Sequence, residues 1–190
     1  MSNIPAPLLV DFYKWGHVGM IPKGTRVIYS NVTPRGAKYF QGLPDYDGKV
    51  LIVGLRRAIN FIFKTWQITF FDKPKDEVLA DIEMELRQAL PSNARIGESL
   101  EHFAKLHDLG YLPVRISCVP EGTRIPLRVP FMTIRNTHDD FAFLTNFLET
   151  IISAETWKTI VNASTAFEFL THLTRDARDT VGGDFATLAE

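Results

Sequence analysis

The chain is poor in cysteine. Cys118 is the single cysteine among 190 residues, so an internal disulfide is excluded, and the composition is typical of a protein of the reducing cytoplasm. Because Cys118 lies in the apolar run 114–119, we expect it to be a buried strand residue and not a reactive thiol. We therefore expect a cytoplasmic protein without a disulfide framework.

The chain also lacks an excess of charge of either sign and any long apolar run. Lysine and arginine total 21 and aspartate and glutamate total 22, which gives a formal net charge of −1. General attraction to nucleic acid or to an anionic membrane is therefore not expected. Residues 1–10 do not combine a basic start with a long apolar stretch, and the apolar run 50–55 is too short to span a bilayer.

Common catalytic and nucleotide-binding motifs are missing as well. The sequence has no Walker-type phosphate loop, no G-x-G-x-x-G after a strand and no serine in a nucleophile turn. His102 and His107 are not spaced like a metal pair on a helix, and His138, Asp139 and Asp140 are typical of helix caps. We predict no metal site and can name no catalytic residue, so local pattern leaves the enzyme class open.

What is present is enough apolar sequence for a core, since 45% of the residues are hydrophobic. Helical spacing predicts helices starting at Gly54, near Asp72 to Pro74 and at Glu98, a further helical region after Asp140, and a last helix over about 154–178. Strands are predicted at 25–33, 114–119, 123–125 and 131–135, and we expect the last three to form one antiparallel unit. The fold class is α+β in a single domain, with an exposed loop over 34–48.

The segment from Asp11 to Pro22 stands out as a short, stiff platform. Asp11 is placed to cap the turn that it starts, and Pro22 ends the helical stretch. Tyr13 and His17 are four residues apart and share a face, and Lys14 is close enough to meet His17. Local pattern alone favours packing of Tyr13 on the core, and the alternative is a tyrosine that stacks on a flat ligand.

Several segments together resemble the N-terminal part of the nicotinamide phosphoribosyltransferase family. The match begins with Asp11, Tyr13, Lys14, His17 and Pro22, and it continues through Tyr29 and Ser30 to Arg35 in a proline-glycine loop. It also includes the Val119-Pro120-Glu121-Gly122 turn and the stretch 144–151. Phe12 and Ile21 depart from the family, where serine and tyrosine are expected, so the resemblance identifies the family and leaves the choice of base open.

The resemblance implies an enzyme of NAD salvage that joins nicotinamide to phosphoribosyl pyrophosphate. It implies that Tyr13 stacks on nicotinamide and that Arg35 contacts phosphate groups, each in the site of the other subunit of a homodimer. Asp11, Lys14 and His17 would support the platform or line the pocket. Arg35 also has a plain interpretation as a solvated turn residue, which local pattern alone favours.

The family continues into an α/β barrel domain that residues 1–190 do not contain, and its complete members use magnesium and ATP. No motif of this chain binds either one, and we expect the chain alone to be inactive. Three alternatives remain open: a part of a nicotinate phosphoribosyltransferase, a non-catalytic module that pairs with a full-length subunit, and a purely structural remnant.

Overall fold

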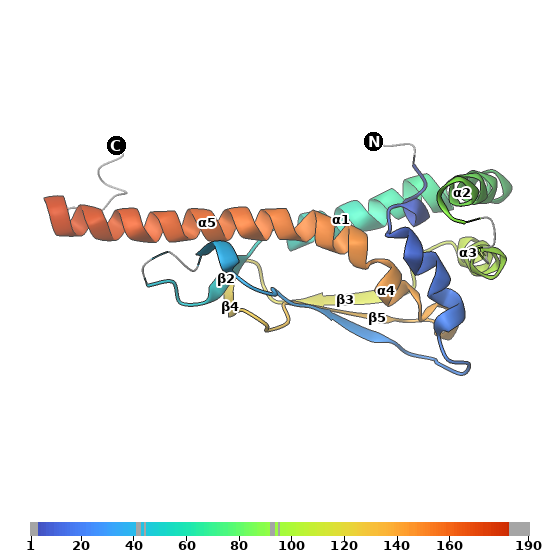
Figure 1. The fold of residues 1–190 in the computed structure, drawn as a ribbon, viewed down its shortest axis with the longest axis horizontal. Helices are drawn as coiled ribbons and strands as arrows, with labels where there is room; N and C mark the ends of the chain where they lie inside the picture. Colours follow the sequence, from blue (N-terminus) through green and yellow to red (C-terminus); the bar gives the residue numbers. More distant parts are fainter. Residues whose placement is uncertain (1–3, 41–42, 44, 92–93, 95, 183–190) are drawn as a thin grey trace.

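A computed structural model describes residues 4–40, 43, 45–91, 94 and 96–182. It has an α+β fold in which helices pack beside short antiparallel strands (Figure 1). The helices are α1 (Leu55–Trp66), α2 (Lys75–Ala89), α3 (Gly97–Leu109), α4 (Leu144–Phe147) and α5 (Glu149–Val181). The strands are β1 (Tyr29–Val32), β2 (Lys49–Ile52), β3 (Val114–Cys118), β4 (Thr123–Pro126) and β5 (Met132–Asn136).

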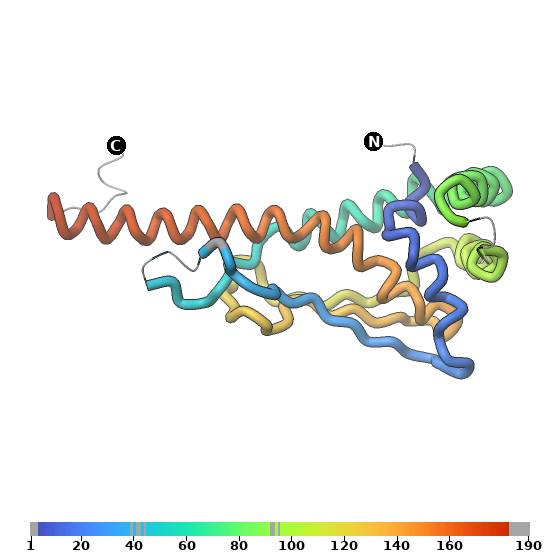
Figure 2. Tube along the Cα trace, viewed as in Figure 1, coloured from blue at the N-terminus to red at the C-terminus, as the bar shows by residue number. Residues whose placement is uncertain are grey.

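The strands form two separate antiparallel sheets. One has the order β1-β5-β3 and the other consists of β2 and β4. Segments that are distant in sequence therefore lie side by side, as the chain trace shows for β1 and β5 (Figure 2). The prediction that 114–119, 123–125 and 131–135 form one unit is wrong for its middle strand, because β4 pairs with β2, where Val50 faces Ile125 and both side chains are buried.

Helix α5 was predicted as two helices but is one continuous helix of 33 residues. Ser153 and Ala154, where we expected a break, fit a helix, whereas the interruption lies at Leu148 between α4 and α5. Gly182 ends α5 in the left-handed conformation with φ 69°, as glycine does at many helix ends. The pair Gly182-Gly183 predicts the end of this helix, and Gly183 lies outside the described residues.

The second sheet is fastened to α5 by polar contacts. The backbone N–H of Leu51 donates to Ser164 Oγ at 2.9 Å. The guanidinium of Arg124 on β4 contacts Glu168 Oε1 at 3.1 Å and lies 4.2 Å from the ring centroid of Phe167. It also donates to both carboxylate oxygens of Asp47. The end of the loop over 34–48 is thereby held against the middle of α5.

A turn residue caps helix α1. Glu121, between β3 and β4, accepts the backbone N–H of Arg56 at 2.8 Å. Hydrogen bonds from the backbone N–H groups of Arg56, Gly54 and Leu55 hold the pKa of Glu121 below its usual value. Glu121 therefore accepts backbone N–H groups of the first helical turn that have no partner within the helix. The N-cap residue of α1, Gly54, has no side chain that could do so.

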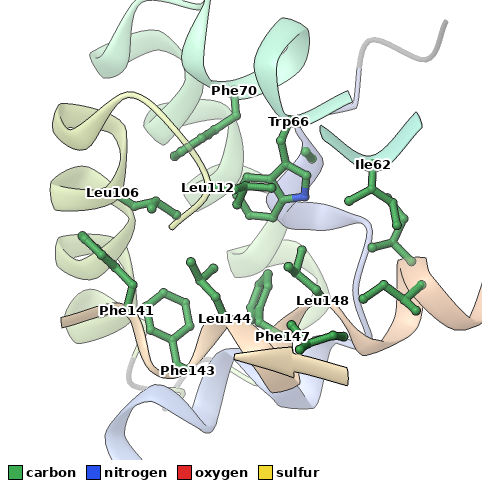
Figure 3. Packing of buried hydrophobic residues seen from close by; sticks show 14 of the residues in the cluster. Ile62, Trp66, Phe70, Leu106, Leu112, Phe141, Phe143, Leu144, Phe147 and Leu148 are labelled. Carbon is green, nitrogen blue, oxygen red and sulfur yellow. The ribbon is translucent and has the colours of Figure 1, made fainter. Parts of the chain in front are cut away.

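The core is centred on aromatic rings from α1, α3 and α4. Phe103 is fully buried, and its ring lies 4.6 Å from that of Trp15 and 5.0 Å from that of Phe147, centroid to centroid. Trp66 and Phe70 close the cluster from the end of α1 and the π-helical turn that follows it (Figure 3). The opening segment is thus anchored by Trp15 in the main core.

Cys118 does not fit its prediction. It lies on strand β3 as expected, but it is exposed, because β3 is an edge strand of the sheet. Partial burial of the thiol, together with the charge of Glu121, raises the pKa of Cys118 above its ordinary value. Among the residues that the structure describes, no helix is both long and apolar enough to cross a membrane.

Candidate functional site

The opening platform consists of two short 3-10 turns, Phe12–Gly16 and Val18–Met20. Asp11 lies at the N-cap position of the first, but its carboxylate makes no capping bond there. It accepts instead from Thr150 Oγ1 at 2.8 Å, and its own N–H donates to the same hydroxyl oxygen at 3.2 Å. The predicted cap is therefore wrong, because the Asp11 carboxylate is directed to the first turn of α5.

Tyr13 is presented at the surface. Its side chain belongs to a residue that is 61% exposed, which contradicts packing on the core. The predicted shared face with His17 is confirmed, since the two rings make an edge contact with centroids 5.2 Å apart. Lys14 Nζ lies 5.6 Å from the centroid of the same tyrosine ring. An exposed aromatic ring that is in contact with His17 and Lys14 is suited to stacking on a flat molecule.

Lys14 is the buried counterpart of this exposed tyrosine. It is 1% exposed, and its ammonium donates to both Asn146 O and Asn146 Oδ1 at 3.0 Å. The ammonium also forms an ion pair with Glu149. The Asn146 amide in turn meets His17 Nδ1 at 2.8 Å, so Lys14 and His17 meet through Asn146. The buried Lys14 side chain thus connects the platform to Asn146 and Glu149.

A polar pocket of about 360 Å³ lies on the other side of Asn146 and Glu149. Its polar and charged lining residues are Ser30, Asn31, Thr33, Arg35, Thr145, Asn146, Glu149 and Ser153. Hydroxyl, amide, carboxylate and guanidinium groups can together hold a ligand with several hydroxyls and a negative charge. Neither Asn146 nor Glu149 was singled out from the sequence, although both lie in the stretch 144–151 that carried the resemblance.

Arg35 lies where two hollows meet. It lines the polar pocket and also a more apolar hollow of about 420 Å³ that includes Trp157 and Phe131. Its side chain is exposed, and among the described residues it makes no ion pair or hydrogen bond. Tyr13 lines a different hollow, of about 520 Å³, together with Gly19 and Glu98. Within one chain the structure therefore does not bring Tyr13 and Arg35 into a common pocket.

The described residues offer no group of three or more His, Cys, Asp or Glu side chains that could hold a metal ion. His138 caps the turn Asp139–Phe141 by accepting the N–H of Asp140, and Asp139 pairs with Arg26. His102 and His107 each contact a backbone carbonyl. The imidazoles of His102, His107 and His138 and the carboxylate of Asp139 are thus engaged in backbone contacts, a turn cap and an ion pair.

Comparison with known proteins confirms the resemblance seen in the sequence. The chain is 41% identical over 169 residues to the nicotinamide phosphoribosyltransferase of Acinetobacter baylyi, a match that covers 88% of this chain and 33% of the relative. The chain thus spans about a third of the length of that curated relative. No family model matches it.

A solved structure agrees at the level of the fold. The crystal structure of human nicotinic acid phosphoribosyltransferase superposes with a TM-score of 0.55 and 19% sequence identity. That alignment covers 83% of this chain and 27% of the human one.

Proposed function

We propose that this chain forms the N-terminal domain, residues 1–190, of a nicotinamide phosphoribosyltransferase of NAD salvage. The observation that carries the proposal is the 41% identity to the Acinetobacter baylyi enzyme over most of the chain. The exposed side chains of Tyr13 and Arg35 support it, because an aromatic ring can stack on a flat base and a guanidinium can bind a phosphorylated sugar. The barrel domain would lie elsewhere in the complete enzyme.

In the proposed reaction the pyridine nitrogen of nicotinamide attacks the anomeric carbon of phosphoribosyl pyrophosphate. The new carbon–nitrogen bond forms as the carbon–oxygen bond to pyrophosphate breaks, and pyrophosphate leaves with the bonding electron pair. Tyr13 would stack on the base and orient it, and Arg35 would offset the growing negative charge of the leaving group. This chain contributes no group that transfers a proton in that scheme.

Both residues would serve the site of a neighbouring subunit in a homodimer. The supporting observation is that Tyr13 and Arg35 are exposed and line different hollows of one chain. An isolated chain would then lack a closed pocket and be inactive.

A chimeric enzyme tests this proposal. In it, this chain replaces the matching 169-residue region of the Acinetobacter baylyi relative. We expect formation of nicotinamide mononucleotide, strongly reduced by Tyr13→Ala and Arg35→Ala and less by Tyr13→Phe, which keeps the ring. Absence of product from the folded, unsubstituted chimera would overturn the proposal.

The base preference is tested in the same chimera. We expect nicotinamide to be used in preference to nicotinate, and the opposite preference would assign the chain to the nicotinate enzymes. The human nicotinic acid enzyme shares the fold but, at 19% identity, gives no reason to prefer nicotinate.

A non-catalytic module that lends Tyr13 and Arg35 to a full-length subunit is a second candidate. The observation that favours it is again the exposure of both residues on one chain. Mixing the purified chain with the complete relative should then change its activity, and Tyr13→Ala should remove the change. An unchanged rate on mixing would count against this candidate.

A further inference from the structure

The ammonium of Lys14 joins the opening turn to a segment that lies more than 130 positions later in the chain. Lys14 follows Tyr13 directly in the turn Phe12–Gly16, whereas its partners Asn146 and Glu149 belong to α4 and the start of α5. Both partners also line the polar pocket that contains Arg35. One buried cation therefore lies between the exposed tyrosine ring and the wall of that pocket.

The contacts of this cation use all three of its donors. The ammonium donates to the backbone carbonyl of Asn146, to its side-chain oxygen and to the carboxylate of Glu149. A lysine that is 1% exposed is costly to bury unless its charge is matched in this way. The backbone bond to Asn146 fixes the turn relative to α4, and the pair with Glu149 fixes it relative to α5.

The side chains around the platform strengthen the same junction. Asn146 contacts His17, whose ring supports the edge of Tyr13. Asp11, at the start of the turn, is bound to Thr150 of α5. The polar side-chain contacts of Asp11, Lys14 and His17 thus point to residues 146–150, and Lys14 makes the most of them, whereas the Trp15 carbonyl accepts from Ser99 of α3.

We propose that Lys14 is a positioning residue, which sets the orientation of Tyr13 relative to the Arg35 pocket through Asn146 and Glu149. This inference rests on the proposed function. Lys14 acts through Tyr13 and does not touch substrate. Loss of the Lys14 ammonium does not alter the Tyr13 side chain itself. It allows the turn Phe12–Gly16, which carries Tyr13, to shift against α4 and α5.

The variant Lys14→Met removes the charge at similar side-chain length. It is expected to fold, because the Glu149 side chain is 54% exposed and can be hydrated when it loses its partner. The double variant Lys14→Met with Glu149→Gln removes both charges. It replaces the single variant in the experiments if the single variant does not fold. Lys75→Met is the matched control, since Lys75 pairs with Asp108 on the surface of α2 and α3, far along the chain from the platform.

Hydrogen exchange of the purified chain gives a readout that needs no catalysis. We expect faster exchange of the amides of residues 12–17 in Lys14→Met, with unchanged protection in α2. Lys75→Met should leave residues 12–17 unchanged. Equal exchange in Lys14→Met and the unsubstituted chain would overturn the inference.

Steady-state kinetics of the chimera give the functional readout. At a temperature where the variant is folded, Lys14→Met should raise the KM for nicotinamide by about ten- to a hundredfold, the size expected when a positioning group shifts by about 1 Å. Lys75→Met should leave the KM unchanged. An active chimera in which Lys14→Met keeps the original KM would overturn this inference alone, whereas an unsubstituted chimera without product would overturn the proposed function.

Discussion

Glu121 shows how one side chain of a turn stabilises a helix that begins 66 residues earlier in the chain. Its carboxylate accepts backbone N–H groups at the start of α1, where it also complements the positive end of the helix. Because these hydrogen bonds lower the pKa of Glu121 in the folded state, their stabilisation is present above the unfolded-state pKa. It is lost as the pH falls through the lower folded-state pKa.

Glu121→Gln is therefore expected to lower the melting temperature at pH 7. The difference from the unsubstituted chain should shrink as the pH falls below 4.5, the ordinary pKa of glutamate, and should vanish below the lower folded-state pKa, where the native carboxylate is protonated as well. Thermal unfolding followed by circular dichroism across this pH range measures it. Glu101→Gln, at an exposed glutamate of α3, is the control, and a pH-independent difference would contradict the role of the charge.

Gly54, at the N-cap of the same helix, is required for two reasons. Its φ of 83° is left-handed, and a Cβ there would lie 2.6 Å from Thr159 Cγ2 of α5. Gly54→Ala should therefore destabilise the fold by about 1–3 kcal/mol. Denaturant unfolding measures the loss, and Gly97→Ala, where a Cβ meets nothing within 4 Å, should stay near zero.

At the scale of elements, the aromatic cluster around Phe103 joins α1, α3 and α4. Phe103→Ala would leave a cavity between five other aromatic rings and should cost about 3–5 kcal/mol. Chemical unfolding measures the free energy of unfolding of Phe103→Ala and of the control variant Phe169→Ala. Phe169 is 61% exposed on α5, so its removal is expected to change the free energy of unfolding by less than about 0.5 kcal/mol. Similar losses at both positions would contradict the assignment of the core.

The sequence predicted the helices well because their apolar spacing extends over several turns. Helices α1, α2 and α3 begin within a few residues of the predicted starts, and Gly110 ends α3 in the left-handed conformation with φ 80°. The sequence did not predict β2, because Lys49–Ile52 is short and lacks an alternating pattern of apolar and polar residues. Its partner β4 was then assigned to the wrong sheet, since strand pairing depends on long-range contacts that local pattern does not contain.

The platform was predictable only in its local part. The four-residue spacing of Tyr13 and His17 gave their shared face, as it would on any helical turn. The partners of Asp11 and Lys14 lie more than 130 positions away, so Thr150, Asn146 and Glu149 could not be found from spacing. The exposure of Tyr13 likewise depends on Trp15, which takes the place in the core that the tyrosine was expected to fill.

At the scale of the whole molecule, we propose that the chain forms a homodimer. The formal net charge of −1 offers little electrostatic repulsion to a second copy. Exposed apolar side chains of α5, among them Trp157, Leu170 and Leu173, also favour association. Sedimentation of the purified chain should show a dimer in exchange with monomer at micromolar concentrations, and a monomer over the whole accessible range would contradict this.

The pairing of β1 with β5 has a consequence for synthesis on the ribosome. Tyr29 pairs with Arg135, about a hundred positions later in the chain. At roughly 5–20 residues per second, β1 would wait on the order of 5–20 s for its partner to be translated. Helices α1 to α3 are complete before then, so they are available to collapse first, while the edge of β1 that pairs with β5 stays open.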